Sequence, residues 1–166
     1  TTLKMSIIKM MDRLKPKRIV IVSSAPQIRY PDCYGIDMAK LEGLVAFRAA
    51  LELLKERNLY HIVDEVYAKC KAQENYHDND VVNYVTAIYA PFTAQEVSDK
   101  IAEMLSSPEI NAEVKIIFQT VEDLHTACPK NLGDWYFTGD YPTPGGNRVV
   151  NRAFMNFYEG KDARAY

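Results

Sequence analysis

The segment from Ser23 to Asp37, which reads S-S-A-P-Q-I-R-Y-P-D-C-Y-G-I-D, gathers side chains suited to binding a small polar ligand. Two hydroxyls can donate to phosphate or sugar oxygens, and a guanidinium can hold an anion through its fork of N–H donors. Two phenol rings can stack on a flat part of a ligand. The candidate binding residues are Ser23, Ser24, Arg29, Tyr30, Tyr34 and the closing Asp37.

A purely structural interpretation of the same segment stays open. Pro26 and Pro31 can stiffen a surface loop, and Arg29 can pair with Asp32. The tyrosines can belong to the core, and loops often carry such residues without a function.

A predicted strand places this segment. Ile19–Val22 is a run of four β-branched residues, and a continuous apolar run is typical of a strand that is covered on both faces. In an open parallel sheet, ligands bind beyond the carboxyl ends of the strands. Because the segment leaves that end of the strand, we expect it to line a binding site.

The rest of the chain alternates between helical and extended patterns. Apolar residues at helical spacing predict helices, and short apolar runs predict strands. This order is typical of an α/β fold with a parallel sheet flanked by helices. The expected elements outside the middle of the chain are helix 3–14, strand 19–22, helix 41–53, strand 114–119, a helix capped by Thr120, strand 134–138 and helix 149–157.

The middle of the chain departs from this alternation. No glycine lies between Gly43 and Gly133, and 59–107 shows helical patterns only, which predict three short helices. Thr93 and Glu96 have the spacing of a capping box at the start of the last one. We therefore expect an inserted helical subdomain, with an oligomer contact as its hypothetical role. The predicted units are 1–57 and 113–166 for the α/β domain and 58–112 for the insertion.

Composition excludes several classes of function. The 166 residues carry a formal charge of −2 with scattered Lys and Arg, so no basic surface for nucleic acid is predicted. No apolar run approaches the ~20 residues of a membrane span, and no signal-like leader opens the chain. Three widely spaced cysteines predict neither a disulfide framework nor a zinc site, which favours a cytoplasmic protein.

Two further patterns favour simple structural roles. His77 lies among acidic residues in N-Y-H-D-N-D, but its spacing follows no metal-binding rule, so a solvated loop between helices is expected. The glycine pair of P-T-P-G-G, Pro142–Gly146, lacks the pattern of a phosphate-binding loop, and we expect a turn there.

Three blocks of this sequence resemble glutamine phosphoribosylpyrophosphate amidotransferases. S-S-A-P-Q-I-R-Y-P-D-C-Y-G-I-D-M is similar to the A-S-A-P-P-I-R-Y-P-N-V-Y-G-I-D-M block of that family. I-I-F-Q-T-V-E-D-L, at 116–124, resembles its L-I-F-Q-x-L-x-D-L, and F-T-G-D-Y-P-T, at 137–143, resembles its F-T-G-x-Y-P-T. The blocks stand in the family's order and leave only the helical insertion without a counterpart.

The resemblance implies an enzyme of the first step of purine synthesis. Such an enzyme releases ammonia from glutamine in one domain and, in a type I phosphoribosyltransferase domain, passes it to phosphoribosylpyrophosphate, forming 5-phosphoribosylamine. The chain then corresponds to the rear part of the second domain and begins inside its phosphate loop, so that Thr1 and Thr2 become phosphate-binding candidates. A frayed terminus is the alternative for these two residues.

The resemblance also implies cofactors and partners. Mg²⁺ serves the leaving pyrophosphate, but the acidic residues for it are expected upstream of this chain, as is the glutaminase cysteine. The positions of the iron–sulfur cysteines of some members carry Asp32, Gly133 and Tyr136 here, so no cluster is expected. Purine nucleotides are expected as effectors, and a homo-oligomer as the assembly.

Two hypotheses follow for the chain itself. In the first, it is the C-terminal fragment of an amidophosphoribosyltransferase and is inactive when isolated. In the second, it is a non-catalytic α/β module that binds a nucleotide or a partner subunit.

Overall fold

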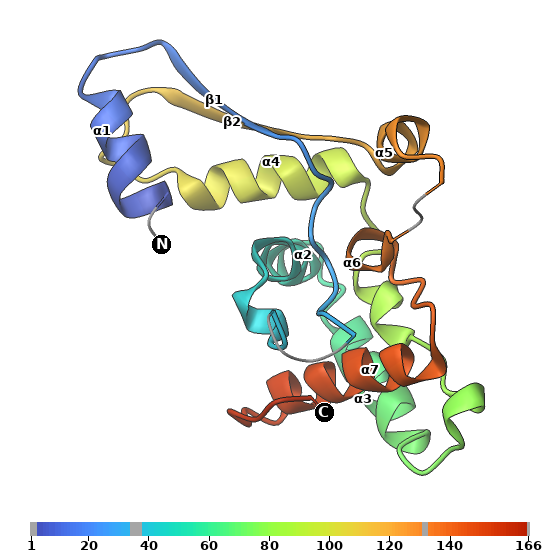
Figure 1. The fold of residues 1–166 in the computed structure, drawn as a ribbon. Coiled ribbons are helices and arrows are strands. Elements are labelled where there is room, and N and C mark those ends of the chain that lie inside the picture. Colours follow the sequence, from blue (N-terminus) through green and yellow to red (C-terminus); the bar gives the residue numbers. More distant parts are fainter. Residues whose placement is uncertain (1–2, 34–37, 131–132, 166) are drawn as a thin grey trace.

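The computed structural model describes residues 3–33, 38–130 and 133–165 and contains two strands among many helices (Figure 1). The elements run in the following order: the π-helix η1 (Leu3–Ile8), α1 (Lys9–Asp12), β1 (Arg18–Ser23), the 3₁₀ turn η2 (Leu41–Gly43), α2 (Val45–Glu56), α3 (His61–Ala72), the 3₁₀ turns η3 (Asp78–Asp80) and η4 (Tyr84–Ile88), α4 (Ala94–Leu105), β2 (Glu113–Phe118), α5 (Val121–Ala127), α6 (Trp135–Thr138) and α7 (Pro144–Tyr158).

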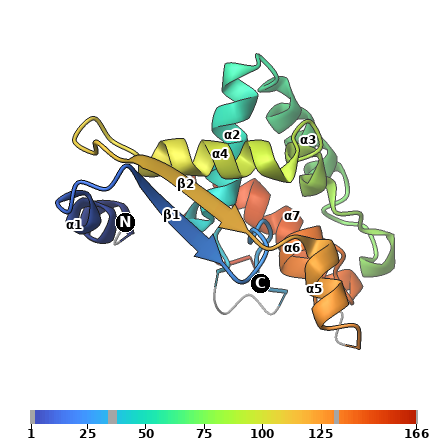
Figure 2. The ribbon, with the colours of Figure 1, turned by 90° about the horizontal axis from the view of Figure 1, so that it is seen from above.

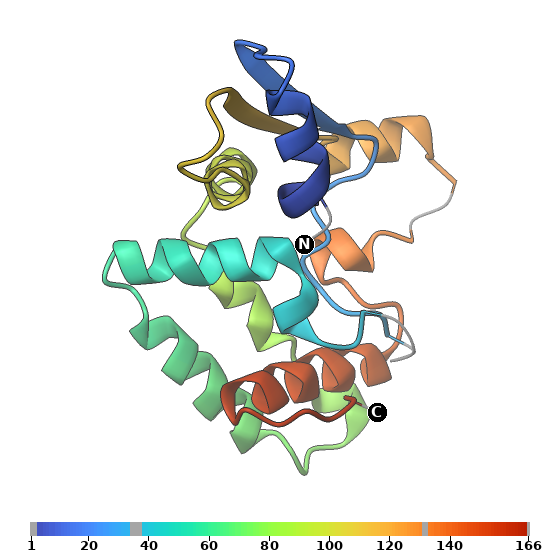
Figure 3. The same cartoon turned by 90° about the vertical axis from the view of Figure 1, so that its left-hand side faces the viewer.

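The two strands form a parallel pair, as the sequence predicts. β1 and β2 pair from Arg18 opposite Glu113 to Ser23 opposite Phe118, so their carboxyl ends lie side by side. α4 runs along the pair, and it covers the same face as the N-terminal helix (Figures 2 and 3). This arrangement is an α/β fold with the expected parallel connection through helices.

In the described part of the chain, helices cover one face of the strand pair, and the expectation of two covered faces is wrong. Ile19 packs beneath the pair with Ile8 and Ala112, whereas Val20 and Val22 are 47% and 71% exposed. Successive side chains point to opposite faces of a strand, and the described helices lie on one of them. A continuous apolar run therefore does not distinguish these two arrangements.

The predicted third strand is wrong, because Trp135–Thr138 forms the short helix α6. The carbonyl of Asp134 accepts hydrogen bonds from the amides of Phe137 and Thr138, which closes the helical turn. Gly139 ends it with φ at +81°, where a Cβ atom would lie 2.9 Å from the ring of Tyr30. A run of four residues is too short for periodicity to separate strand from helix.

The main hydrophobic core lies among α2, α3, η4, α4 and α7 (Figure 1). It draws residues from all three predicted units, with Phe47 from the first, Val97 from the second and Phe154 from the third. The boundaries of the predicted insertion stay a prediction. Of its three expected helices, the first and last are α-helices, while the middle one is a set of 3₁₀ turns.

The glycine pair is helical, and the expectation of a turn is wrong. Pro144, Gly145 and Gly146 form the first turn of α7, a position that proline favours because its missing N–H has no partner to lose there. Gly146 is buried against the ring of Tyr141. In the described part of the chain, no helix is both long and apolar enough to cross a membrane.

The predicted capping box at the start of α4 is confirmed. The amide of Glu96 donates to the hydroxyl of Thr93, and the carboxylate of Glu96 accepts the Thr93 amide at 2.8 Å. Arg57 from the end of α2 also donates to that carboxylate. The Arg57 guanidinium, followed by the amide and hydroxyl of Thr93, lowers the pKa of Glu96 from its ordinary 4.5 to about 2.

We predict that the stabilising effect of Glu96 disappears in acid. A carboxyl whose pKa is lowered by folding stabilises the folded state fully above its unfolded-state pKa, and the effect is lost as the pH falls from about 4.5 to about 2. Urea unfolding should show Glu96→Gln less stable than the unmodified chain at pH 7, with a much smaller difference at pH 2.5. Glu65→Gln, at an exposed site on α3, is the control and should show no such change.

Candidate binding site

The backbone of the segment that follows β1 is hydrogen-bonded to three residues distant in the sequence. The amides of Arg29 and Tyr30 both donate to the carbonyl of Tyr136 in α6, at 2.8 and 3.1 Å. The hydroxyl of Tyr89 donates to the Arg29 carbonyl at 2.7 Å, and that of Tyr141 donates to the Pro31 carbonyl at the same distance. Residues 29–31 are therefore a fixed part of the fold.

Gln27 connects this segment to α4 and uses its whole side-chain amide to do so. Its Nε2 donates to the carbonyl of Ala94 and to the hydroxyl of Ser98, both at 2.7 Å. Its Oε1 accepts from Nε and Nη2 of Arg29 at 3.1 and 2.8 Å. The side chain is buried, and the donors on one side and the acceptors on the other determine which way the amide points.

Arg29 is half-buried and forms no ion pair with any described carboxylate. Its guanidinium lies 5.2 Å from the centre of the Tyr89 ring, a cation–π contact, and points one edge at Gln27. The alternative in which Arg29 pairs with Asp32 is wrong. Asp32 is buried and instead accepts a hydrogen bond from the Tyr136 hydroxyl at 3.1 Å.

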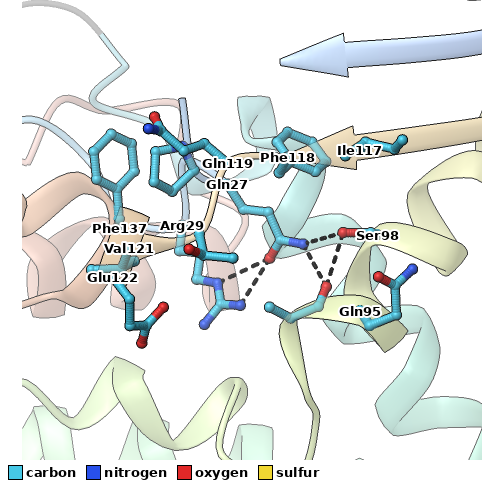
Figure 4. A pocket seen from close by; sticks show the side chains of 13 residues that line it. Gln27, Arg29, Gln95, Ser98, Ile117, Phe118, Gln119, Val121, Glu122 and Phe137 are labelled. Atoms are coloured by element: carbon cyan, nitrogen blue, oxygen red, sulfur yellow. Dashed lines mark hydrogen bonds between the residues drawn. The ribbon is translucent and has the colours of Figure 1, made fainter. Parts of the chain in front are cut away.

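A cavity of about 400 Å³ opens beside Arg29, at the carboxyl ends of both strands (Figure 4). This size suits a small metabolite. Its apolar wall comes from the end of β2, the start of α5, α6 and the loop after β1: Ile117, Phe118, Val121, Phe137 and Pro26. Its polar side chains are Gln27, Arg29, Gln95, Ser98, Gln119, Thr120 and Glu122.

The candidate residues from the sequence fall into three groups. Arg29 lines the cavity. Ser23 does not, and its hydroxyl is hydrogen-bonded to the backbone of Ala25. Ser24 is exposed at the end of β1, outside the cavity lining. Tyr30 is 3% exposed in the main core, edge-on to Tyr89, which matches the structural alternative for this ring. Thr1, Thr2, Tyr34 and Asp37 lie outside the described residues.

Tyr89 and Tyr141 serve as neutral hydrogen-bond donors to this segment. Burial raises the pKa of Tyr30, Tyr89 and Tyr141 well above the ordinary value of 10.0, so their hydroxyls keep their protons at neutral pH. Burial likewise raises the pKa of Cys70 to about 12, and burial followed by the nearby Asp32 raises that of Cys33. These groups suit binding and support rather than proton transfer or nucleophilic attack.

Among residues 3–33, 38–130 and 133–165, no three His, Cys, Asp or Glu side chains are arranged to hold a metal ion. Among the described residues that line the cavity, Glu122 supplies one carboxylate. Asp32 and Tyr136, which stand where some amidotransferases carry cluster cysteines, contact each other and supply no thiolate. The absence of a cluster stays a prediction.

The fold and the cavity define a class: an α/β protein with a candidate ligand site where two parallel strands end. Among curated proteins, the chain is similar to an amidophosphoribosyltransferase from Saccharomyces cerevisiae, with 28% identity over 124 residues. The match covers 69% of this chain and 24% of the yeast protein, so the chain spans about a quarter of that relative's length. No protein-family model and no solved structure matches it.

Proposed function

We propose that this chain is the C-terminal part of an amidophosphoribosyltransferase, an enzyme that makes 5-phosphoribosylamine from phosphoribosylpyrophosphate and glutamine. One observation carries the proposal. The three blocks that resemble this family are far apart in the sequence, yet all of them line the same cavity. Arg29 comes from the first block, Gln119 from the second and Phe137 from the third.

The meeting of these blocks supports a shared binding role better than three separate structural roles. Residues that pack a core need only be apolar and of suitable size, whereas this cavity combines amides and aromatic rings with a guanidinium that forms no ion pair among the described residues. The yeast relative carries the same name as the family suggested by the blocks, and its likeness extends over most of this chain. The proposed fold is a partial type I phosphoribosyltransferase domain.

In the proposed enzyme, this chain binds and shields the substrate. Arg29 holds an anionic group, Phe118 and Phe137 exclude water, and Thr1 and Thr2 complete a phosphate loop that begins upstream. Mg²⁺ would neutralise the leaving pyrophosphate, with ligands outside this chain. Purine nucleotides are the proposed effectors, and the proposed setting is a cytoplasmic homo-oligomer.

A non-catalytic role for the isolated chain has one observation in its favour. The described cavity contains Glu122 as its sole ionisable acid, no histidine and no cysteine, which is little equipment for proton transfer. In this second reading the chain binds a nucleotide or a partner subunit without turnover. The two readings agree that these 166 residues alone do not convert substrate.

The reading frame and the activity of its product test the proposal. We expect the codons upstream of Thr1 to encode D-D-S-I-V-R-G, and the whole protein to release pyrophosphate from phosphoribosylpyrophosphate when glutamine is added. The isolated chain should release none, and Arg29→Met in the whole protein should lower kcat/KM about tenfold or more. Arg48→Met, at an exposed site on α2, is the control. An unrelated upstream sequence, or a whole protein without this activity, would refute the assignment.

A further inference from the structure

We propose that the cavity binds a small phosphate monoester and that α4 belongs to its binding site, because α4 holds Gln27 and, through it, the guanidinium of Arg29. The choice of a phosphate-bearing ligand rests on the proposed function. The contribution of α4 does not, since it follows from hydrogen bonds between described residues. This helix lies within the predicted insertion, for which the resemblance offers no role.

The first step is the unused binding capacity of Arg29. A guanidinium has five N–H donors, and in the described residues Gln27 accepts from two of them. The remaining three have no acceptor in the described part of the chain, although the side chain is half-buried and lines the cavity. A partly desolvated cation without a counter-ion is unfavourable, and an anionic ligand removes that cost.

The second step is the orientation of the guanidinium. Gln27 is 4% exposed and Ser98 is 5% exposed, so their hydrogen bond is shielded from water. Ser98 accepts from Gln27 and donates to the Ala94 carbonyl at 2.9 Å, which closes a triangle with the Gln27–Ala94 bond. Figure 4 shows Gln27 reaching from the loop to Ser98, with Arg29 on its oxygen side. Ser98 and Gln27 are thus positioning residues for Arg29.

The third step is the match between the cavity and the ligand class. A phosphate monoester presents three oxygens to a fork of donors, and Arg is suited to such multidentate contacts. The apolar wall that includes Phe118 and Phe137 can cover the organic part of the ligand. The carboxylate of Glu122 repels an anion, but its side chain is exposed at the start of α5, where water screens its charge.

Calorimetric titration of this chain tests the proposal, with AMP and adenosine as probes that differ by one phosphate. We expect AMP to bind at least about tenfold more tightly than adenosine, because the phosphate gains charge-assisted hydrogen bonds to Arg29. Arg29→Met should abolish this preference, and Arg29→Lys should keep part of it. Glu122→Gln should tighten AMP about twofold, since it removes a like charge. Equal affinity for the two probes, or no binding of AMP to folded protein, would overturn the proposal.

A matched pair of serines on α4 tests the role of that helix. Ser98 and Ser106 each donate to the carbonyl four residues earlier, but Ser106 lies at the other end of α4, outside the cavity lining. Ser98→Ala should weaken the binding of AMP about three- to tenfold and leave the affinity for adenosine unchanged. Ser106→Ala should change neither affinity. If Ser98 were purely structural, its replacement would instead weaken the binding of both probes together or of neither. That result would overturn the role of α4.

The outcomes separate this inference from the proposed function. One outcome is that the whole protein turns over phosphoribosylpyrophosphate, while Ser98→Ala leaves the AMP affinity of this chain unchanged. This outcome would refute the inference and leave the proposed function standing. The other outcome is that the whole protein shows no turnover, while the AMP affinities follow the expected pattern. This outcome would refute the proposed function and support the inference.

Discussion

Replacing Phe47 with alanine is expected to lower the free energy of unfolding by about 3–5 kcal/mol, the range typical of a deleted buried aromatic ring. Phe47 is completely buried and joins the first part of the chain to the last. Its ring meets those of Phe154 and Phe157 edge-on, with centroids 6.2 and 4.9 Å away. The loss therefore removes apolar burial and two favourable ring contacts at once.

Urea unfolding, followed by circular dichroism, measures this effect. Leu14→Ala is the control, because Leu14 follows the N-terminal helix and is 77% exposed. It should change the free energy of unfolding by no more than about 0.5 kcal/mol. Similar effects of the two substitutions would show that α2 and α7 do not share a core.

The second large effect is expected from Gly146→Ala, which should destabilise the chain by about 1–3 kcal/mol. A Cβ atom at Gly146 would lie 2.5 Å from Cβ, Cγ and Cδ1 of Tyr141, closer than packed atoms allow. The collision involves the base of the ring, so Tyr141 cannot simply rotate its far end away. Its displacement also breaks the hydrogen bond to the Pro31 carbonyl, which supports the loop after β1.

The neighbouring glycine gives a matched control for this prediction. A Cβ atom at Gly145 would meet nothing closer than the Thr143 hydroxyl at 4.0 Å. Because alanine has the higher helix propensity, Gly145→Ala should be neutral or stabilise the chain by up to about 1 kcal/mol. Thermal unfolding should therefore show a lower Tm for Gly146→Ala and an unchanged or higher Tm for Gly145→Ala, and equal shifts in Tm would contradict this account of the packing.

Local signals in the sequence predicted much of the fold. The capping box at Thr93, the cap at Thr120 and the apolar run at Ile19–Val22 each act over a few residues, and each forms the expected element. Patterns of four or five residues were less informative. They did not separate a strand from a helix at Trp135–Thr138, or a turn from a helix start at Gly145 and Gly146.

The site was harder to predict because its organisation depends on contacts between distant residues. Arg29 was predicted as an anion-binding residue from its chemistry, and it lines the cavity. Gln27 and Ser98 were missed, since they are 71 residues apart and no local pattern connects the two positions. The sequence offered one signal for Gln27: it stands at a position where the family block has proline.

The place of α6 has a practical consequence for following ligand binding. The chain has a single tryptophan, Trp135, and it opens α6, whose next residue holds the amides of Arg29 and Tyr30 through its carbonyl. Its indole emission is thus an intrinsic optical reporter next to Tyr136, the residue that accepts the hydrogen bonds of the loop. Binding experiments on this chain can be read out in solution without attaching a dye.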